Sequence, residues 1–144
     1  MEQQPLYARL VARKTVREKM NKPAEIVADG KLLVPAPNDV EALVKRIPKG
    51  RVMTQGELRE ELARAAGVEA TCPLTTGIFL RLVAEASEED AAAGKTRVAP
   101  WWRVVRDDGR LWDKSPGGIA EQARRLRDEG VSIVVKRGVS RVAV

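Results

Sequence analysis

The residue types that most often perform chemistry are scarce in this chain. Its 144 residues contain no histidine and one cysteine, Cys72. Without histidine, no Ser-His-Asp or Cys-His arrangement and no histidine-ligated metal site can be built within the chain. One cysteine also excludes an internal disulfide framework and a cysteine-cluster zinc site. Cys72 could act as a thiol nucleophile near a helix N-terminus, but a free cysteine before a proline is more often a small buried residue.

The segment 100–105 holds two adjacent tryptophans, Trp101 and Trp102, followed by Arg103. Successive side chains on a strand point to opposite faces, so we expect at least one indole to face a cleft, a partner or solvent. An aromatic plane beside a guanidinium can receive a nucleobase. The alternative is a hydrophobic turn packed on the core, which is the usual role of an apolar cluster.

Charge is distributed unevenly along the chain, whose formal net charge is +6. Residues 95–144 carry twelve Lys and Arg against six Asp and Glu, whereas residues 39–94 carry seven against ten. A basic C-terminal third beside an acidic middle favours a polyanionic partner, with a solvated charged surface as the alternative. No apolar run is long enough for a membrane span, and the N-terminus lacks a signal-peptide pattern, so we expect a cytoplasmic protein without a membrane partner.

Periodicity and turn patterns predict an α+β fold, a small, mostly helical, winged-helix-like domain with a C-terminal β-hairpin. The expected helices cover residues 4–20, 39–47, 54–66, 75–86 and 118–128, with a loop over 87–99. The expected strands are 31–34, 103–106 and two that flank a turn at Arg137-Gly138. A proline-rich linker at 35–38 separates a basic N-terminal extension, residues 1–38, from a domain at 39–144.

Capping patterns define the ends of these helices. Thr54, with a glutamate three residues later, forms a capping box, and Gly67 suits the C-cap of the same helix. Asp39 is the expected N-cap of the preceding helix, and Thr75 or Thr76 that of the following one. The helices at 54–66 and 75–86 resemble a helix-turn-helix. In the last helix the pattern turns Ile119, Ala123 and Leu126 inward and Arg124, Arg125 and Arg127 outward.

Three blocks, in order, resemble the C-terminal DNA-binding domain of the methylated-DNA–protein-cysteine methyltransferases. Residues 47–56, IPKGRVMTQG, are similar to the family's I-P-x-G-x-V-x-T-Y-G, and residues 100–105, PWWRVV, to its P-C-H-R-V-V. Residues 108–131 resemble its glycine-rich turn and its final helix, which ends in L-x-x-E-G. The resemblance spans roughly residues 39–131 and implies that domain's fold and binding to double-stranded DNA.

The departures from this pattern concern the reacting groups. In the family, the cysteine of P-C-H-R accepts the alkyl group from guanine, and the histidine, working with a glutamate, generates the thiolate. The corresponding positions here are Trp101 and Trp102, and Glu129 matches the glutamate. Because alkyl transfer needs a thiolate, the resemblance implies no enzyme activity at this site. The first replacement is similar to that in the alkyltransferase-like proteins, which carry P-W-H-R and bind alkylated DNA with the base flipped out but do not repair it.

Two further positions differ from the family pattern. The tyrosine that helps to rotate the nucleotide is Gln55 here, and the arginine that the family inserts into the duplex has no counterpart in residues 75–78. The residues predicted to contact DNA are Thr54, Gln55, Thr75, Thr76, Arg81 and Arg103. The predicted base pocket contains Trp101, Trp102 and Glu129.

These observations lead to two hypotheses. The first is a non-enzymatic DNA-binding protein of the alkyltransferase-like type that recognises alkylated guanine for repair, with a repair protein as a further partner and without cofactor or metal. In the second, the two indoles fill the base pocket instead of lining it, because two bulky side chains can occupy the space of a base. The scaffold would then be a general DNA-binding or protein-interaction module.

Overall fold

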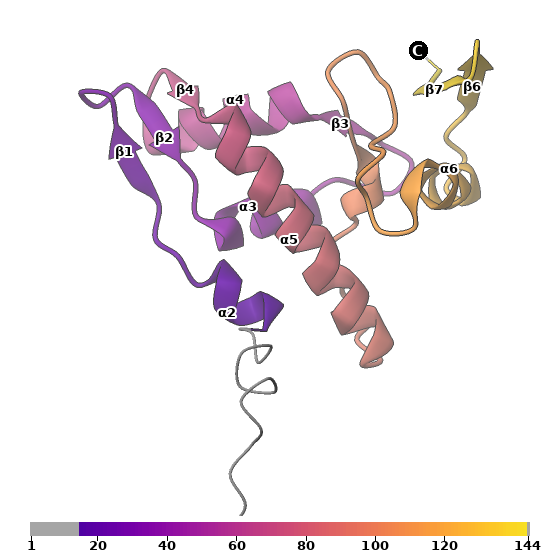
Figure 1. The fold of residues 1–144 in the computed structure, drawn as a ribbon, viewed down its shortest axis with the longest axis horizontal. Coiled ribbons are helices and arrows are strands. Elements are labelled where there is room, and N and C mark those ends of the chain that lie inside the picture. Colours follow the sequence, from indigo (N-terminus) through magenta and orange to yellow (C-terminus); the bar gives the residue numbers. More distant parts are fainter. Residues whose placement is uncertain (1–14, 144) are drawn as a thin grey trace, which may run out of the picture.

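The computed structural model describes residues 15–143 and has a mixed α+β fold (Figure 1). Its helices are α2 (Val16–Met20), α3 (Pro37–Lys45), α4 (Gln55–Ala66), α5 (Pro73–Ala92) and α6 (Gly118–Asp128), with a 3-10 turn, η1, at Trp101–Arg103. Its strands are β1 (Glu25–Val27), β2 (Leu32–Val34), β3 (Met53–Thr54), β4 (Ala70–Thr71), β5 (Val104–Val105), β6 (Ile133–Lys136) and β7 (Val139–Val142). The predicted fold class is therefore confirmed. None of the described helices is both long and apolar enough to cross a membrane.

The helix expected over residues 4–20 lies mostly outside the described residues. Its described part is the short α2, which Thr15 caps through a reciprocal capping box with Glu18. Val16 and Met20 of α2 are buried in the same core as α3 and α5. Arg17 joins α2 to both helices, because its guanidinium lies 2.7 Å from Glu41 and 2.5 Å from Asp90.

The predicted ends of α4 are confirmed. The Thr54 hydroxyl accepts the amide hydrogen of Glu57 at 3.0 Å, and the Thr54 amide donates to the Glu57 carboxylate at 3.2 Å. Gly67 ends the helix in the left-handed conformation, with φ of 72°. A capping box and a glycine C-cap are local signals, so short sequence patterns predict both ends of this helix.

The predicted starts of α3 and α5 are wrong. Proline occupies the first position of both helices, which suits its fixed φ and missing amide hydrogen, and neither N-cap residue makes a side-chain cap. Ala36 precedes α3, so residues 37 and 38 form its first turn and not a linker. Cys72 precedes α5, which places Thr75 and Thr76 inside the helix.

The loop expected over residues 87–99 is also wrong in its first part, because α5 continues to Ala92. Two polar side chains in this stretch are buried and have partners that lie far away in the sequence. The Ser87 hydroxyl donates to the Ala99 carbonyl at 2.7 Å, and Asp90 accepts from Arg17. The sequence predicted a loop here because the partners of Ser87 and Asp90 lie outside the short window from which a helix is predicted.

Three small sheets connect the helices. β1, β2 and β4 form one sheet, in which neither β1 nor β4 was predicted, and β3 pairs in parallel with β5. This second pair joins the start of α4 to the end of η1. The predicted C-terminal hairpin is confirmed as β6 and β7, with Arg137 and Gly138 both at positive φ in the turn. Positive φ at both turn residues matches the twist of a two-residue hairpin.

Two hydrophobic clusters support these elements. The larger one surrounds α5, which runs diagonally across the middle of the molecule (Figure 1) and buries Leu80 and Val83 completely. The smaller one, built around Val105 and Leu126, lies beneath the C-terminal hairpin. Trp102 packs against both clusters, so the tryptophan segment lies where the two parts of the core meet.

Candidate functional site

Trp101 and Trp102 lie on the 3-10 turn η1 and not on a strand, so the expected alternation of side chains does not hold. Trp101 is completely buried. Its indole nitrogen donates to the Glu88 carboxylate of α5 at 2.8 Å. Its ring meets Trp102 edge-on at a centroid distance of 5.9 Å and Trp112 at 6.5 Å. The chain's three tryptophans therefore form one contiguous cluster, in which Trp101 occupies the centre.

Trp102 is half-buried and is held by the charged pair Arg103–Glu129. The indole nitrogen of Trp102 donates to the Glu129 carboxylate at 3.1 Å. Arg103 binds the same carboxylate through two nitrogens, at 2.8 and 2.6 Å, and donates to the Ile47 carbonyl at 2.6 Å. Burial raises the pKa of Glu129, but the hydrogen bonds from Arg103 and Trp102 outweigh burial and lower the pKa overall. Glu129 is thus a paired carboxylate anion.

Arg125 of α6 completes this cluster, although the sequence pattern turned it outward. Its guanidinium carbon lies 5.1 Å from the Trp101 ring centroid and 5.0 Å from that of Trp102. It also pairs with Glu88 at 2.7 Å. The helical pattern was also wrong for Ile119, which it turned inward and which is 38% exposed. An arginine whose guanidinium lies within cation–π distance of two indoles is held by aromatic surface, and hydrophobic periodicity does not register this contact.

Gln122 is a second residue that the sequence analysis missed. It is fully buried, and its amide nitrogen donates to the carbonyls of Trp102 and Val104 at 3.1 and 2.8 Å. Its amide oxygen accepts the Trp112 amide hydrogen at 2.7 Å. These three bonds attach α6 to the backbone of the tryptophan segment. A glutamine on the apolar face of a helix, next to Ala123, was the signal that could have found it.

Two of the residues predicted to contact DNA have side chains that are withdrawn from solvent. The Thr76 side chain is buried and its hydroxyl donates to the Cys72 carbonyl at 2.7 Å, so Thr76 is not available to a phosphate. Arg103 is also withdrawn, since its side chain is 14% exposed and bound to Glu129. Thr75 is half-buried in the first turn of α5, and Arg81, further along that helix, is exposed and 3.5 Å from Glu85.

Gln55 and Thr54 lie at the start of α4. The Thr54 side chain serves as the helix cap, as described above. Gln55 lines a shallow groove of about 300 Å³ together with two arginines and two aspartates, which are Arg106, Arg110, Asp107 and Asp108. Asp107 also accepts the Gly56 amide hydrogen at 2.6 Å, so a carboxylate already occupies one of the free amides of this helix N-terminus.

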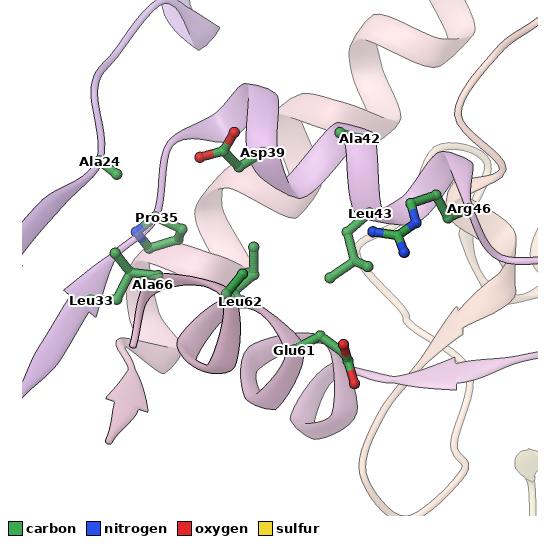
Figure 2. A pocket seen from close by; sticks show the side chains of 11 residues that line it. Ala24, Leu33, Pro35, Asp39, Ala42, Leu43, Arg46, Glu61, Leu62 and Ala66 are labelled. Carbon is green, nitrogen blue, oxygen red and sulfur yellow. The ribbon is translucent and has the colours of Figure 1, made fainter. Parts of the chain in front are cut away.

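Other possible reaction centres are separate from the tryptophan cluster. A groove of about 310 Å³ between α3 and α4 has an apolar floor that includes Leu33, Leu43 and Leu62, with a charged rim that includes Arg46 and Glu61 (Figure 2).

The pKa of the Cys72 thiol is lowered, mainly by the Thr75 side chain and also by the Thr75 amide. Within residues 15–143, no group of three or more carboxylates or thiols is placed to hold a metal ion.

Comparison with protein families places this arrangement in context. Residues 35–131 match the model of the "6-O-methylguanine DNA methyltransferase, DNA binding domain". The chain belongs to this family. The match covers α3 to α6, which carry the tryptophan cluster and every predicted contact residue. No curated protein sequence matches the chain significantly.

Two solved structures share the fold of this methyltransferase DNA-binding domain. One is S. pombe Atl1 in complex with damaged DNA containing O6-carboxymethylguanine, with 24% identity, a TM-score of 0.51, and coverage of 74% of this chain and 87% of that chain. The other is S. pombe ATL in complex with DNA, with 25% identity, a TM-score of 0.52, and coverage of 75% and 87%.

Proposed function

We propose that this chain is a non-enzymatic DNA-binding protein of the alkyltransferase-like type whose base pocket is filled by its own side chains. One observation carries the second part of the proposal. Trp101, which the sequence resemblance aligns with the acceptor cysteine, is completely buried. An indole that formed the wall of an open pocket would keep one face accessible to a base. Of the two hypotheses from sequence, this geometry supports the filled pocket.

The remaining groups of the cluster strengthen this interpretation. Glu129, which the resemblance pairs with a histidine, is bound by Arg103 and Trp102. A flipped guanine would have to displace the Trp102 ring, break its bond to Glu129 and separate it from Arg125. Unstacking a base already costs a few kcal/mol, and a pocket must offset that cost. A pocket that must first break its own internal contacts provides less binding free energy to offset the cost of unstacking.

Cys72 does not replace the missing acceptor. It precedes α5, whereas Glu88, the partner of Trp101, lies sixteen residues further along the same helix. At a rise of about 1.5 Å per residue, this separation is about 24 Å. A base presented to the tryptophan cluster therefore cannot reach the thiol. We infer that the chain accepts no alkyl group.

Binding to duplex DNA is supported by the family membership and by the DNA held in the two S. pombe structures. Near the start of α4, the side chains that remain available to phosphates are Gln55, in the first turn of that helix, and the exposed Arg106, which line the same groove. Contacts of this kind are largely electrostatic, so affinity should fall steeply as the salt concentration rises.

The test is a titration of two labelled duplexes that differ by one O6-alkylguanine, followed by fluorescence anisotropy at several salt concentrations. We expect equal affinity for both duplexes and no mass gain of the protein after incubation with the alkylated one. A clear preference for the lesion would contradict the filled pocket and support damage recognition. Absence of binding at low salt would contradict the DNA-binding function and support a protein-interaction module.

A further inference from the structure

Exposed basic side chains gather around the C-terminal end of α3. Two of them, Lys45 and Arg97, are distant in the sequence and line one hollow of about 380 Å³. Two others, Arg46 and Arg51, line a second hollow of about 320 Å³. We call this set the basic strip, and its five exposed members are Lys45, Arg46, Lys49, Arg51 and Arg97.

The basic strip carries positive charge that the protein does not neutralise. In the part of the chain that the structure describes, none of its five side chains forms an ion pair. Two carboxylates, Asp39 and Glu61, share a groove with Arg46 (Figure 2), but neither pairs with it, and Glu61 pairs with Arg64. Like charges gathered without counter-charges repel one another, so this surface favours a polyanion.

The loop that carries most of the strip is fixed to the charged pair beneath Trp102. Arg103 donates to the Ile47 carbonyl at 2.6 Å, and the Gly50 amide donates to the Glu129 carboxylate at 3.5 Å. A backbone hydrogen bond of 3.1 Å closes the turn at 48–51, in which Gly50 has a φ of 82°. The strip is therefore presented by a held loop, and Glu129, which matches the family's glutamate, serves here as one of its anchors.

The strip and the groove lined by Gln55 and Arg106 lie at opposite ends of the β3–β5 pair. The two strands run in parallel, so the residues that precede them lie together at one end and those that follow lie together at the other. Arg51 precedes β3, whereas Gln55 follows β3 and Arg106 follows β5. A duplex bound at the groove therefore occupies one end of the pair and leaves the strip at the other end accessible.

We propose that the basic strip binds the phosphate backbone of a second duplex, so that one molecule holds two DNA segments together. This inference rests on the proposed DNA-binding function and deepens it by adding a second site. Contacts from lysine and arginine to phosphates fix a protein on DNA without reading its sequence. They require no flipped base, so a protein whose base pocket is filled by Trp101 and Trp102 can still make them.

The experiment compares the wild-type chain with a strip variant, Lys45→Gln/Lys49→Gln/Arg51→Gln, and with a control variant, Lys22→Gln/Lys31→Gln/Lys114→Gln. Each variant loses three exposed cations, so the net charge falls equally in both. The first measurement is the amount of a fluorescent duplex that each protein retains on beads carrying a second, unlabelled duplex. Anisotropy gives the affinity for a single dilute duplex at several salt concentrations, and sedimentation of the DNA-free proteins gives their oligomeric state.

We expect the strip variant to retain at least about tenfold less of the fluorescent duplex than the control variant, because three phosphate contacts are lost. Its affinity for a single duplex, and the salt dependence of that affinity, should match those of the control variant. Arg97→Gln changes a different loop of the strip and should give a smaller loss of retention in the same direction.

Three results would overturn the second site while leaving DNA binding intact. In the first, the wild type retains no fluorescent duplex, or all proteins retain the same amount. In the second, the slope of log affinity against log salt for a single duplex falls by about three in the strip variant only, since each lost phosphate contact removes about 0.9, and the strip then lies on the same duplex as the groove. In the third, the wild type is a dimer that the strip variant does not form, which assigns the strip to self-association. Absence of wild-type binding to a single duplex would overturn both proposals.

Discussion

Replacing Trp101 by alanine tests directly whether this side chain fills the interior. A buried Trp→Ala change costs about 3–5 kcal/mol because the removed atoms leave a cavity that closes only in part. The variant also loses the hydrogen bond to Glu88 and the cation–π contact with Arg125, each of which adds about 1 kcal/mol. We therefore expect the free energy of unfolding to fall by about 5–7 kcal/mol. This is a large share of the roughly 5–15 kcal/mol that stabilises a typical domain.

The assay is urea denaturation followed by far-UV circular dichroism, which reports the helices independently of the removed indole. Trp101→Phe keeps part of the packing and should lose less stability, so it remains measurable if the alanine variant is unfolded. Added indole should raise the unfolding midpoint of the alanine variant by binding in the cavity, as apolar ligands do in engineered cavities. A loss of about 0.5 kcal/mol or less, the range of surface substitutions, would show that Trp101 is not part of the core.

Three other substitutions test the contacts around the core. Gln122→Ala should reduce the free energy of unfolding in urea by about 3 kcal/mol, because it removes three hydrogen bonds to backbone groups, two of them buried. Arg17→Met should cost about 1–3 kcal/mol in the same assay, since it removes the guanidinium that pairs with Glu41 and Asp90 in a partly buried place. Glu129→Gln should destabilise the protein more at neutral pH than in acid. The pKa of Glu129 is lowered in the folded state, so its contribution is complete above the unfolded value of about 4.3 and is lost as the pH falls through the folded value. If Glu129→Gln shifted the urea midpoint equally at neutral and at acid pH, the predicted pH dependence would be refuted.

The parts of the fold that the sequence predicts are those set by local chemistry. The capping box at Thr54, the glycine that ends α4 and the turn at Arg137-Gly138 each depend on residues within a few positions of one another. The extent of α5 is different, because its last turns depend on Ala99 and Arg17, which are distant in the sequence. Long-range partners of this kind do not leave a periodic signal.

The same distinction applies to the candidate site. The sequence identifies Trp101, Trp102 and Glu129 as one site, and the structure brings them together. The sequence cannot show that the Arg125 guanidinium lies over both rings, since the helical pattern predicts that an arginine at this position faces solvent. The expectation that the two indoles point to opposite faces assumed a strand, whereas the backbone at Trp101–Arg103 forms a 3-10 turn. Thr76 and Arg103 were predicted DNA contacts because of their residue types, and each is instead engaged within the protein.

The clustering of all three tryptophans has a spectroscopic consequence. Because each indole lies within 6.5 Å of Trp101, excitation of any ring can pass to its neighbours, and the near-ultraviolet emission of the whole protein reports one place. Contacts made at the start of α5 would leave this emission unchanged unless the cluster itself moves. A ligand that alters the intrinsic emission therefore changes the surroundings of the tryptophan cluster, either by contact with the half-buried Trp102 or by a change in packing. A ligand that binds without altering the emission leaves the cluster unchanged.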